Sequence, residues 1–200
     1  MTDQPLGLAP EQWQRLAAAR QAYADTVSPY YEETLHEVTR RACTSGGIGK
    51  ADIRALLMWK RLRADTPWAA ELMALADTDV RRATAAATTA ARDTTLSRCA
   101  GAQASRAALA HLPGFRTGDA LASAVLTAAV PDRMAIYDRR AHSGLHTFGI
   151  TLSHAPGRYS RYSRYSRYIE TIDQLLAAAP APIRTWTPRD MDTALYWLTA

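Results

Sequence analysis

The spacing of apolar residues predicts helices along most of the chain. Trp13, Leu16 and Tyr23 are spaced so that they share one face of a helix. The same spacing recurs over residues 53–60 and 68–75. No stretch alternates β-branched or aromatic residues with polar ones for long enough to predict a strand. We therefore expect an all-α protein of about eight to ten helices joined by loops of a few residues.

Three dipeptides mark places where helices are expected to begin. A residue whose side chain can cap a helix precedes proline at Ser28-Pro29, Thr66-Pro67 and Thr187-Pro188. The helix that starts at Ser28 should end by Gly46-Gly47, whereas helix boundaries within residues 79–110 stay open. With 200 residues, we treat the chain as a single helical domain spanning residues 1–200.

Residues 158–168 form a low-complexity segment in which Arg-Tyr-Ser is repeated. On a helix, this repeat would form slowly rotating stripes of arginine and tyrosine that could lie along a nucleic acid. The alternative is a solvated linker before a helix over residues 169–179. Because compositional assignments of this kind are weak, we favour the linker.

Two glycines and one aspartate form the most informative stretch of the sequence. Residues 112–126 contain a Leu-Pro-Gly turn, followed by Gly118 and a run rich in alanine, leucine and valine. A short loop that begins at Pro131 then leads to Asp138. Glycines let the backbone turn tightly and approach another group, and amides at the start of a helix suit a phosphate. The stretch predicts a grip for a DNA phosphate with a carboxylate beside it.

Charge and cysteine usage narrow the choice of partners and compartment. Lysine and arginine number 24 against 19 acidic residues, giving a net charge of +5. This balance fits nucleic acid but also many other soluble proteins. Cys43 and Cys99 are isolated, which excludes a four-thiolate zinc or iron–sulfur site and fits a reducing compartment. No run of about 18 apolar residues is present, so we expect a cytoplasmic protein with no membrane partner.

The stretch from Leu112 to Asp138 resembles the helix–hairpin–helix element of the DNA glycosylase superfamily that includes endonuclease III and the alkyladenine and oxoguanine glycosylases. Residues 112–115 match its Leu-Pro-Gly-apolar turn, Gly118 matches its second glycine, and Asp138 falls at its aspartate. A little-characterised branch is similar in further motifs, which are Trp59-Lys60, Ala122-Ser123-Ala124, the Pro-Asp-Arg…Tyr-Asp-x-Arg loop from Pro131 to Arg140, and residues 186–197.

The resemblance implies a compact helical domain that binds double-stranded DNA in base-excision repair. It makes Asp138 the catalytic carboxylate of a DNA glycosylase, and it makes Gly114, Phe115, Arg116 and Gly118 the DNA-binding hairpin. In the superfamily, carbonyls of this hairpin often hold a Na⁺ or K⁺ ion, and no other cofactor is expected. We expect a monomer, nucleoid-associated if the protein is bacterial.

The sequence departs from the superfamily pattern at three points. Arg116-Thr117 lengthens the hairpin by two residues. Ala120 stands where bifunctional members carry the lysine that attacks the sugar, so we expect a monofunctional enzyme without lyase activity. The four-cysteine cluster of endonuclease III is missing. A catalytically inactive DNA-binding or structural member of the same fold is therefore the alternative, and a protein-interaction module is a third.

Each candidate site residue also has a structural interpretation. Asp138 could simply cap the helix that follows it. Trp59 and Tyr137, which could line a pocket for a flipped base, could instead belong to the core. Asp138, His142 and His146 are spaced four apart, as in helical metal sites, but they lack another clear ligand. We therefore expect no metal.

Overall fold

Helices make up the regular structure of the computed structural model, which describes residues 6–116, 118–152 and 163–199. Within these ranges there are ten α-helices and two short 3-10 helices, and no strand, which confirms the all-α prediction. The helices are α1 (Pro10–Thr26), η1 (Pro29–Glu32), α2 (Glu33–Ser45), α3 (Lys50–Trp59), α4 (Pro67–Ala74), α5 (Asp77–Arg92), α6 (Arg98–Leu109), α7 (Ala120–Ala129), α8 (Arg139–His146), α9 (Arg164–Ala178), η3 (Ile183–Thr185) and α10 (Pro188–Trp197).

Local capping explains several of the helix boundaries. The Ser28 hydroxyl accepts the Tyr30 amide, but it opens the 3-10 helix η1, and α2 follows only from Glu33. Gly46 ends α2 in the left-handed conformation, with φ of 74°. Thr187 caps α10 by accepting the Asp190 amide. The helix predicted from Ser28 to Gly46 is therefore divided into two elements.

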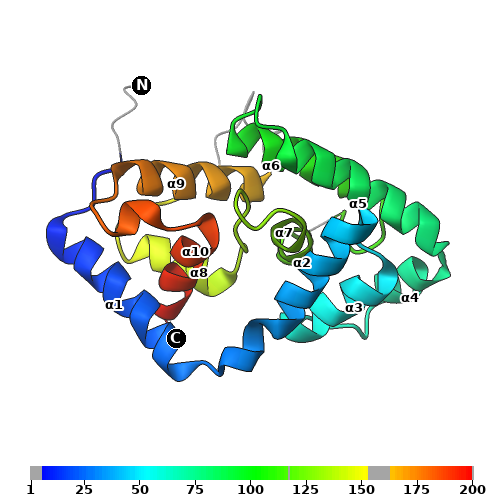
Figure 1. Ribbon diagram of the computed structural model, residues 1–200, viewed down its shortest axis with the longest axis horizontal. Coiled ribbons are helices and arrows are strands. Elements are labelled where there is room, and N and C mark those ends of the chain that lie inside the picture. Colours follow the sequence, from blue (N-terminus) through cyan, green and yellow to red (C-terminus); the bar gives the residue numbers. More distant parts are fainter. Residues whose placement is uncertain (1–5, 117, 153–162, 200) are drawn as a thin grey trace.

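The helices form two groups that lie side by side (Figure 1). In one group, α10 packs against α1, α8 and α9. In the other, α5 packs along α6, while α7 contacts α2, α3, α5 and α6. The chain crosses between the groups through η1 and through the segment before α8, and α9 also packs on α6. The segment that ends at Asp138 therefore lies where the two groups meet.

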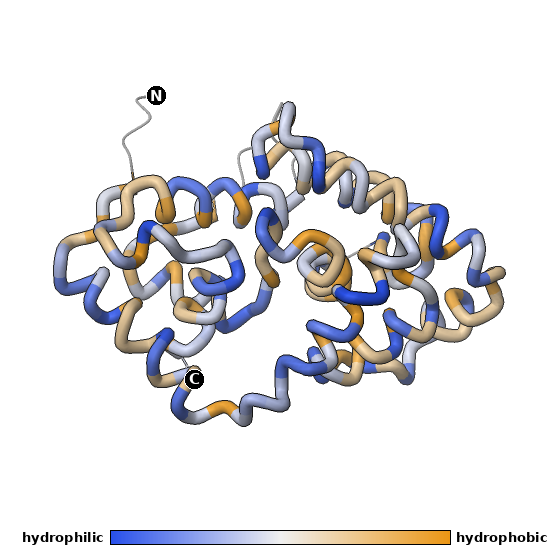
Figure 2. The backbone as a smooth tube through the Cα atoms, viewed as in Figure 1, coloured by the Kyte–Doolittle hydropathy of each residue, from blue (hydrophilic) through white to orange (hydrophobic). Residues whose placement is uncertain are grey.

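The helix α7 runs through the middle of the molecule and is buried on nearly all sides. Figure 2 shows it as a largely hydrophobic stretch between more polar helices. Its residues from Leu121 to Ala129 are all buried. A helix that is apolar all round belongs in a core, and its many alanines let neighbouring helices approach closely. The Ala-rich run after Gly118 is thus explained by packing.

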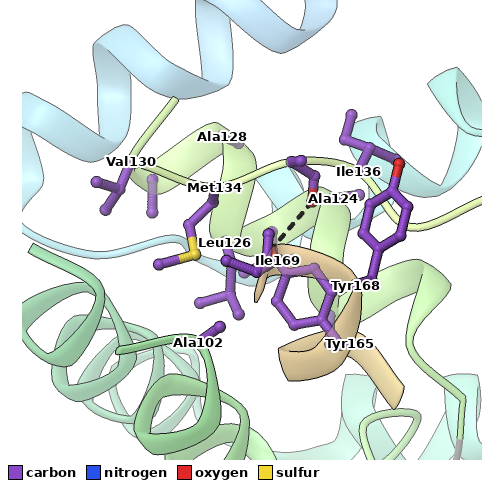
Figure 3. Close-up of a cluster of buried hydrophobic side chains, with 14 of the residues drawn as sticks. Ala102, Ala124, Leu126, Ala128, Val130, Met134, Ile136, Tyr165, Tyr168 and Ile169 are labelled. Atoms are coloured by element: carbon purple, nitrogen blue, oxygen red, sulfur yellow. Dashed lines mark hydrogen bonds between the residues drawn. The ribbon is translucent and has the colours of Figure 1, made fainter. Parts of the chain in front are cut away.

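The end of the Arg-Tyr-Ser segment belongs to the core. Helix α9 begins at Arg164, and the side chains of Tyr165 and Tyr168 are completely buried. The Tyr165 hydroxyl donates to the Ala135 carbonyl at 3.1 Å, beside α7 residues (Figure 3). The three-residue repeat places both tyrosines on one helix face. The linker interpretation is therefore wrong for residues 163–168, while residues 158–162 lie outside the described ranges.

The predicted hairpin connects α6 to α7, and its two glycines have different surroundings. Both are left-handed, with φ of 85° at Gly114 and 81° at Gly118. The Trp68 ring lies against Gly114, so a Cβ there would come within 2.3 Å of it, whereas a Cβ at Gly118 would meet nothing. The Phe115 side chain is completely buried, and its amide donates to the Leu112 carbonyl at 3.1 Å. The first half of the hairpin is therefore a packing joint.

Substitution of each glycine by alanine separates backbone strain from packing. We expect Gly118→Ala to lower the free energy of unfolding by about 1–2 kcal/mol, because a left-handed residue with a Cβ is strained. Gly114→Ala should cost about 1–3 kcal/mol more, because its Cβ also meets the Trp68 ring. Urea unfolding of both variants measures the difference. Equal losses would show that the ring moves aside at no cost.

Candidate functional site

Asp138 lies at the start of α8 with both carboxylate oxygens engaged. Oδ1 accepts the Arg140 amide at 2.7 Å, which caps the helix. Oδ2 accepts Nζ of Lys60 at 2.5 Å. The Lys60 side chain is 10% exposed and that of Asp138 is 26% exposed. The helix-capping interpretation of Asp138 is thus confirmed, and a lysine from the other group of helices stands beside the carboxylate.

A second, buried carboxylate holds the segment that carries Asp138. Asp192 of α10 is almost completely buried, and its Oδ2 accepts the Ile136 amide at 2.6 Å. The Arg189 guanidinium donates to the other oxygen of Asp192 and to Glu32 at 2.9 Å. The ion pair of Arg189 with Glu32 therefore joins α10 to η1, whereas its ion pair with Asp192 lies within α10. Since Ile136 lies two residues before Asp138, this network positions the catalytic candidate.

The surroundings of Asp138 keep it ionised. Burial alone opposes the charge, but the Lys60 ammonium and the hydrogen bonds from Lys60 and the Arg140 amide outweigh it and lower the pKa of Asp138. For Asp192 the balance is reversed, because burial raises its pKa and Arg189 only limits the rise. Of the two carboxylates, Asp138 is the one that is both partly exposed and has a lowered pKa.

A pocket of about 340 Å³ opens beside the Lys60–Asp138 pair, near the lower end of the size range of small-molecule sites. Both groups of helices contribute to it. Its aromatic lining consists of Tyr23, Tyr31, Trp59, Tyr196 and Trp197. The Arg189 guanidinium lies over the Trp59 ring, 5.6 Å from its centre. Rings of this kind suit a flat, partly polar ligand.

A second hollow also borders this ion pair. Lys60 and Asp138 line it together with Gly118, Ala120 and Tyr137. The Arg106 guanidinium anchors this end of the hairpin, since it donates to the Asp119 carboxylate at 3.1 Å and to the Gly118 carbonyl at 3.2 Å. The carboxylate therefore stands between an aromatic pocket and the end of the hairpin.

The residues predicted for the site are only partly brought together. Trp59 lines the aromatic pocket and Tyr137 the hollow towards the hairpin, so they line different cavities beside Asp138. Arg116 is exposed, whereas Phe115 belongs to the core and has neither side chain nor amide available for DNA. Sequence reasoning missed that Lys60 binds Asp138. The Trp-Lys motif drew attention to Lys60 but did not indicate that Asp138 is its partner.

The roles of Asp192 and Arg189 were also missed in the sequence. Each is an ordinary charged residue in an amphipathic helix when it is judged by its neighbours in the chain. The signal that was available was their spacing of three residues, which permits an ion pair on one helix face. The burial of Asp192, which gives the pair its importance, follows only from the packing of α10 against α8 and α1.

The described ranges contain neither a candidate metal site nor a helix that could cross a membrane. No group of three His, Cys, Asp or Glu side chains there could hold a metal ion. His142 and His146 pack edge to face, with ring centres 4.6 Å apart. Among these same residues, no helix is long and apolar enough to cross a membrane.

Comparison with known proteins gives no match: no family model, no curated protein and no solved structure is significantly similar to this chain. The function of the site must therefore be inferred from the positions and chemistry of its own residues.

Removal of the Lys60 charge should destabilise the protein in a pH-dependent way. The lowered pKa of Asp138 contributes stability above the pKa of the unfolded carboxyl, and this is lost as pH falls through the folded value. We expect Lys60→Gln to cost about 1–2 kcal/mol near pH 7 and much less near pH 3. Denaturant unfolding at both pH values measures this cost.

The matching control for this measurement is Lys60→Gln introduced into Asp138→Asn, where no charge remains to be paired. The pH dependence should then shrink to the weaker effect of Lys60 on the buried Asp192 carboxyl. A cost for Lys60→Gln that is the same at both pH values would contradict the ion pair as its origin.

Proposed function

We propose that this protein is a DNA-binding helix–hairpin–helix protein that removes a damaged base by hydrolysing its N-glycosidic bond, with Asp138 as the essential carboxylate. The observation that carries the proposal is that Asp138 lines both the aromatic pocket and the hollow that reaches Gly118 of the hairpin. A base in the pocket and a backbone at the hairpin would place the connecting sugar beside this carboxylate.

The chemistry follows from the charge of Asp138. A base must leave the DNA stack before an enzyme can reach its bond to the sugar, and stacking on rings such as Trp59 offsets part of that cost. As the base departs with the electron pair of the C–N bond, positive charge develops on the sugar. An ionised carboxylate stabilises this charge and orients the water that adds to the sugar. The lowered pKa of Asp138 suits it to this role.

Lys60 supports a monofunctional reaction in this proposal. Its ammonium is paired with Asp138, and a protonated amine cannot attack a sugar. Lys60 then holds the carboxylate in place and keeps it charged. Ala120, at the start of α7, also lines the hollow towards the hairpin and offers no amine. Base release without strand cleavage is therefore the expected outcome.

Double-stranded DNA is the proposed partner, held through its phosphates. Arg116 and Gly118 form the exposed part of the hairpin, and the chain carries a net charge of +5. Gly114 and Phe115 support the turn from within the core. The hydrolysis needs no cofactor. A monovalent cation at the hairpin has fewer ligands to use, because the Gly118 carbonyl already accepts from Arg106. We propose a monomer acting in cytoplasmic base-excision repair.

A catalytically inactive DNA-binding protein is the second candidate, and one observation favours it. Both oxygens of Asp138 are occupied, one by the Arg140 amide and one by Lys60. A carboxylate that only caps a helix and joins two groups of helices would show the same contacts. Substitution of Asp138 distinguishes the two candidates, because only the enzyme loses a reaction.

Asp138→Asn is the central test of the catalytic proposal. Asparagine also caps helices well, so the fold should be retained while the charge is lost. We expect base release to fall at least about 100-fold with DNA binding kept within a few-fold. The assay uses duplexes that carry deaminated, alkylated or oxidised bases. Undiminished release by the variant would sink the role of Asp138, and no release by the wild type from any lesion would favour the inactive protein.

The monofunctional assignment can be tested separately with borohydride. A lysine that attacks the sugar forms an imine, which borohydride reduces to a stable protein–DNA adduct. We expect no adduct with duplexes containing an abasic site and no strand cleavage, because the Lys60 ammonium is paired. Lys60→Gln is the matched control. An adduct that forms with wild type and disappears in this variant would show that Lys60 is a nucleophile.

A further inference from the structure

Arg61 follows helix α3 in the left-handed backbone conformation, which glycine usually adopts. The amide of Leu62 donates to the Leu57 carbonyl at 2.9 Å, and the amide of Arg61 donates to the Met58 carbonyl at 3.1 Å. This pair of bonds is the Schellman arrangement, in which the residue in Arg61's place is left-handed and usually glycine. Arg61 has φ of 54° and is the one non-glycine residue with positive φ in the described part of the chain.

The chain uses glycine at comparable turns elsewhere. Gly46 ends α2 with φ of 74°, and Gly149 follows α8 with φ of 73°. A residue with a Cβ is disfavoured in this conformation, so an arginine there holds backbone strain. Strain of this kind persists where the surrounding structure over-determines it, and it is concentrated at functional sites. The contacts of the Arg61 side chain therefore indicate whether this strain has a function.

The Arg61 side chain lines the aromatic pocket and is unpaired. It is exposed, and the described residues offer it no hydrogen bond or ion pair. From the other group of helices, the exposed Arg140 lines the same pocket. The Arg140 guanidinium lies over the Tyr196 ring and donates to its hydroxyl at 3.3 Å, and no carboxylate pairs with it within the described ranges.

The other cations of this pocket are neutralised. Lys60 is paired with Asp138, and Arg189 is paired with Asp192 and Glu32. The positive charge at the pocket that lacks a carboxylate partner therefore belongs to Arg61 and Arg140, one from each group of helices. Two guanidinium groups present planar sets of donors that match the oxygens of a phosphate.

We propose that Arg61 and Arg140 form a clamp for a DNA phosphate at the mouth of the aromatic pocket. This inference rests on the proposed function and adds a second backbone contact to it. Gly118 of the hairpin lines the second hollow together with Asp138 and Lys60. The strand is then held on both sides of the extruded nucleotide, which offsets the cost of taking the base out of the stack.

Binding measurements on three variants test the clamp. Arg61→Gly and Arg140→Gln each remove one guanidinium, whereas Arg63→Ala removes an exposed one that pairs with Asp65 and does not line the pocket. The probe is a labelled duplex of about 20 base pairs with a tetrahydrofuran abasic site, titrated between about 50 and 300 mM NaCl. Fluorescence anisotropy gives Kd at each salt concentration.

We expect the salt dependence, log K against log[NaCl], to become shallower by about 0.9 in Arg61→Gly and in Arg140→Gln, with about fivefold to tenfold weaker binding near 0.1 M salt. Arg63→Ala should stay within about twofold of wild type. The nucleotide dAMP carries the same phosphate chemistry and is the second probe. Binding of dAMP as tight as that of the duplex would overturn the clamp on a DNA strand.

Arg61→Gly has a second readout that a merely structural arginine would not give. Glycine relieves the left-handed strain, so the variant should melt about 2–4 °C higher than wild type while binding DNA less tightly. A lower Tm would overturn the strain argument, and duplex binding by Arg61→Gly and Arg140→Gln equal to that of Arg63→Ala would overturn the clamp.

Failure of the proposed function would look different from failure of the clamp. If wild type binds the duplex and the salt dependence becomes shallower by about 0.9 in each clamp variant, the clamp stands even when no base is released. If wild type shows no salt-dependent binding to the duplex, both ideas fail together.

Discussion

The buried carboxylate of Asp192 is the constraint on which the arrangement of the site depends. A charge removed from water must be fully paired, and here the Ile136 amide and the Arg189 guanidinium satisfy its two oxygens. The amide bond fixes the segment that leads to Asp138, and Arg189 in turn reaches Glu32 near the crossing between the two groups of helices. One buried charge thus sets the course of both the loop and the crossing.

Two carboxylates at one site have different environments and therefore different roles. Asp192 is buried and stabilises the fold, whereas Asp138 lines the pocket and has a lowered pKa. Lys60 connects Asp138 to the end of α3, so the ion pair also ties the two groups of helices together. Because this pair separates an aromatic pocket from a hollow at the hairpin, the same contact that stabilises the fold defines the place where chemistry is proposed.

The first half of the hairpin serves packing, although its glycines predict contact with DNA. Gly114 makes room for the Trp68 ring, and Phe115 fills the core. Only Gly118 and Arg116 are exposed among the residues predicted to bind DNA. The proposed phosphate binding therefore has only a few exposed groups to use, to which Arg61 and Arg140 are the proposed additions.

The sequence by itself determined the helical class and several helix starts, because these depend on spacing and on hydrogen bonds between near neighbours. It left the capping role of Asp138 open beside the catalytic one, and the bond from the Arg140 amide two residues on shows the cap. Only the tertiary structure decided that Lys60 meets Asp138 across 78 positions, and that Arg189 meets Glu32 across 157. It likewise buried Tyr165 and Tyr168. Such pairs depend on how whole helices pack, and the pattern along any one helix shows which face is buried but not which residue lies opposite.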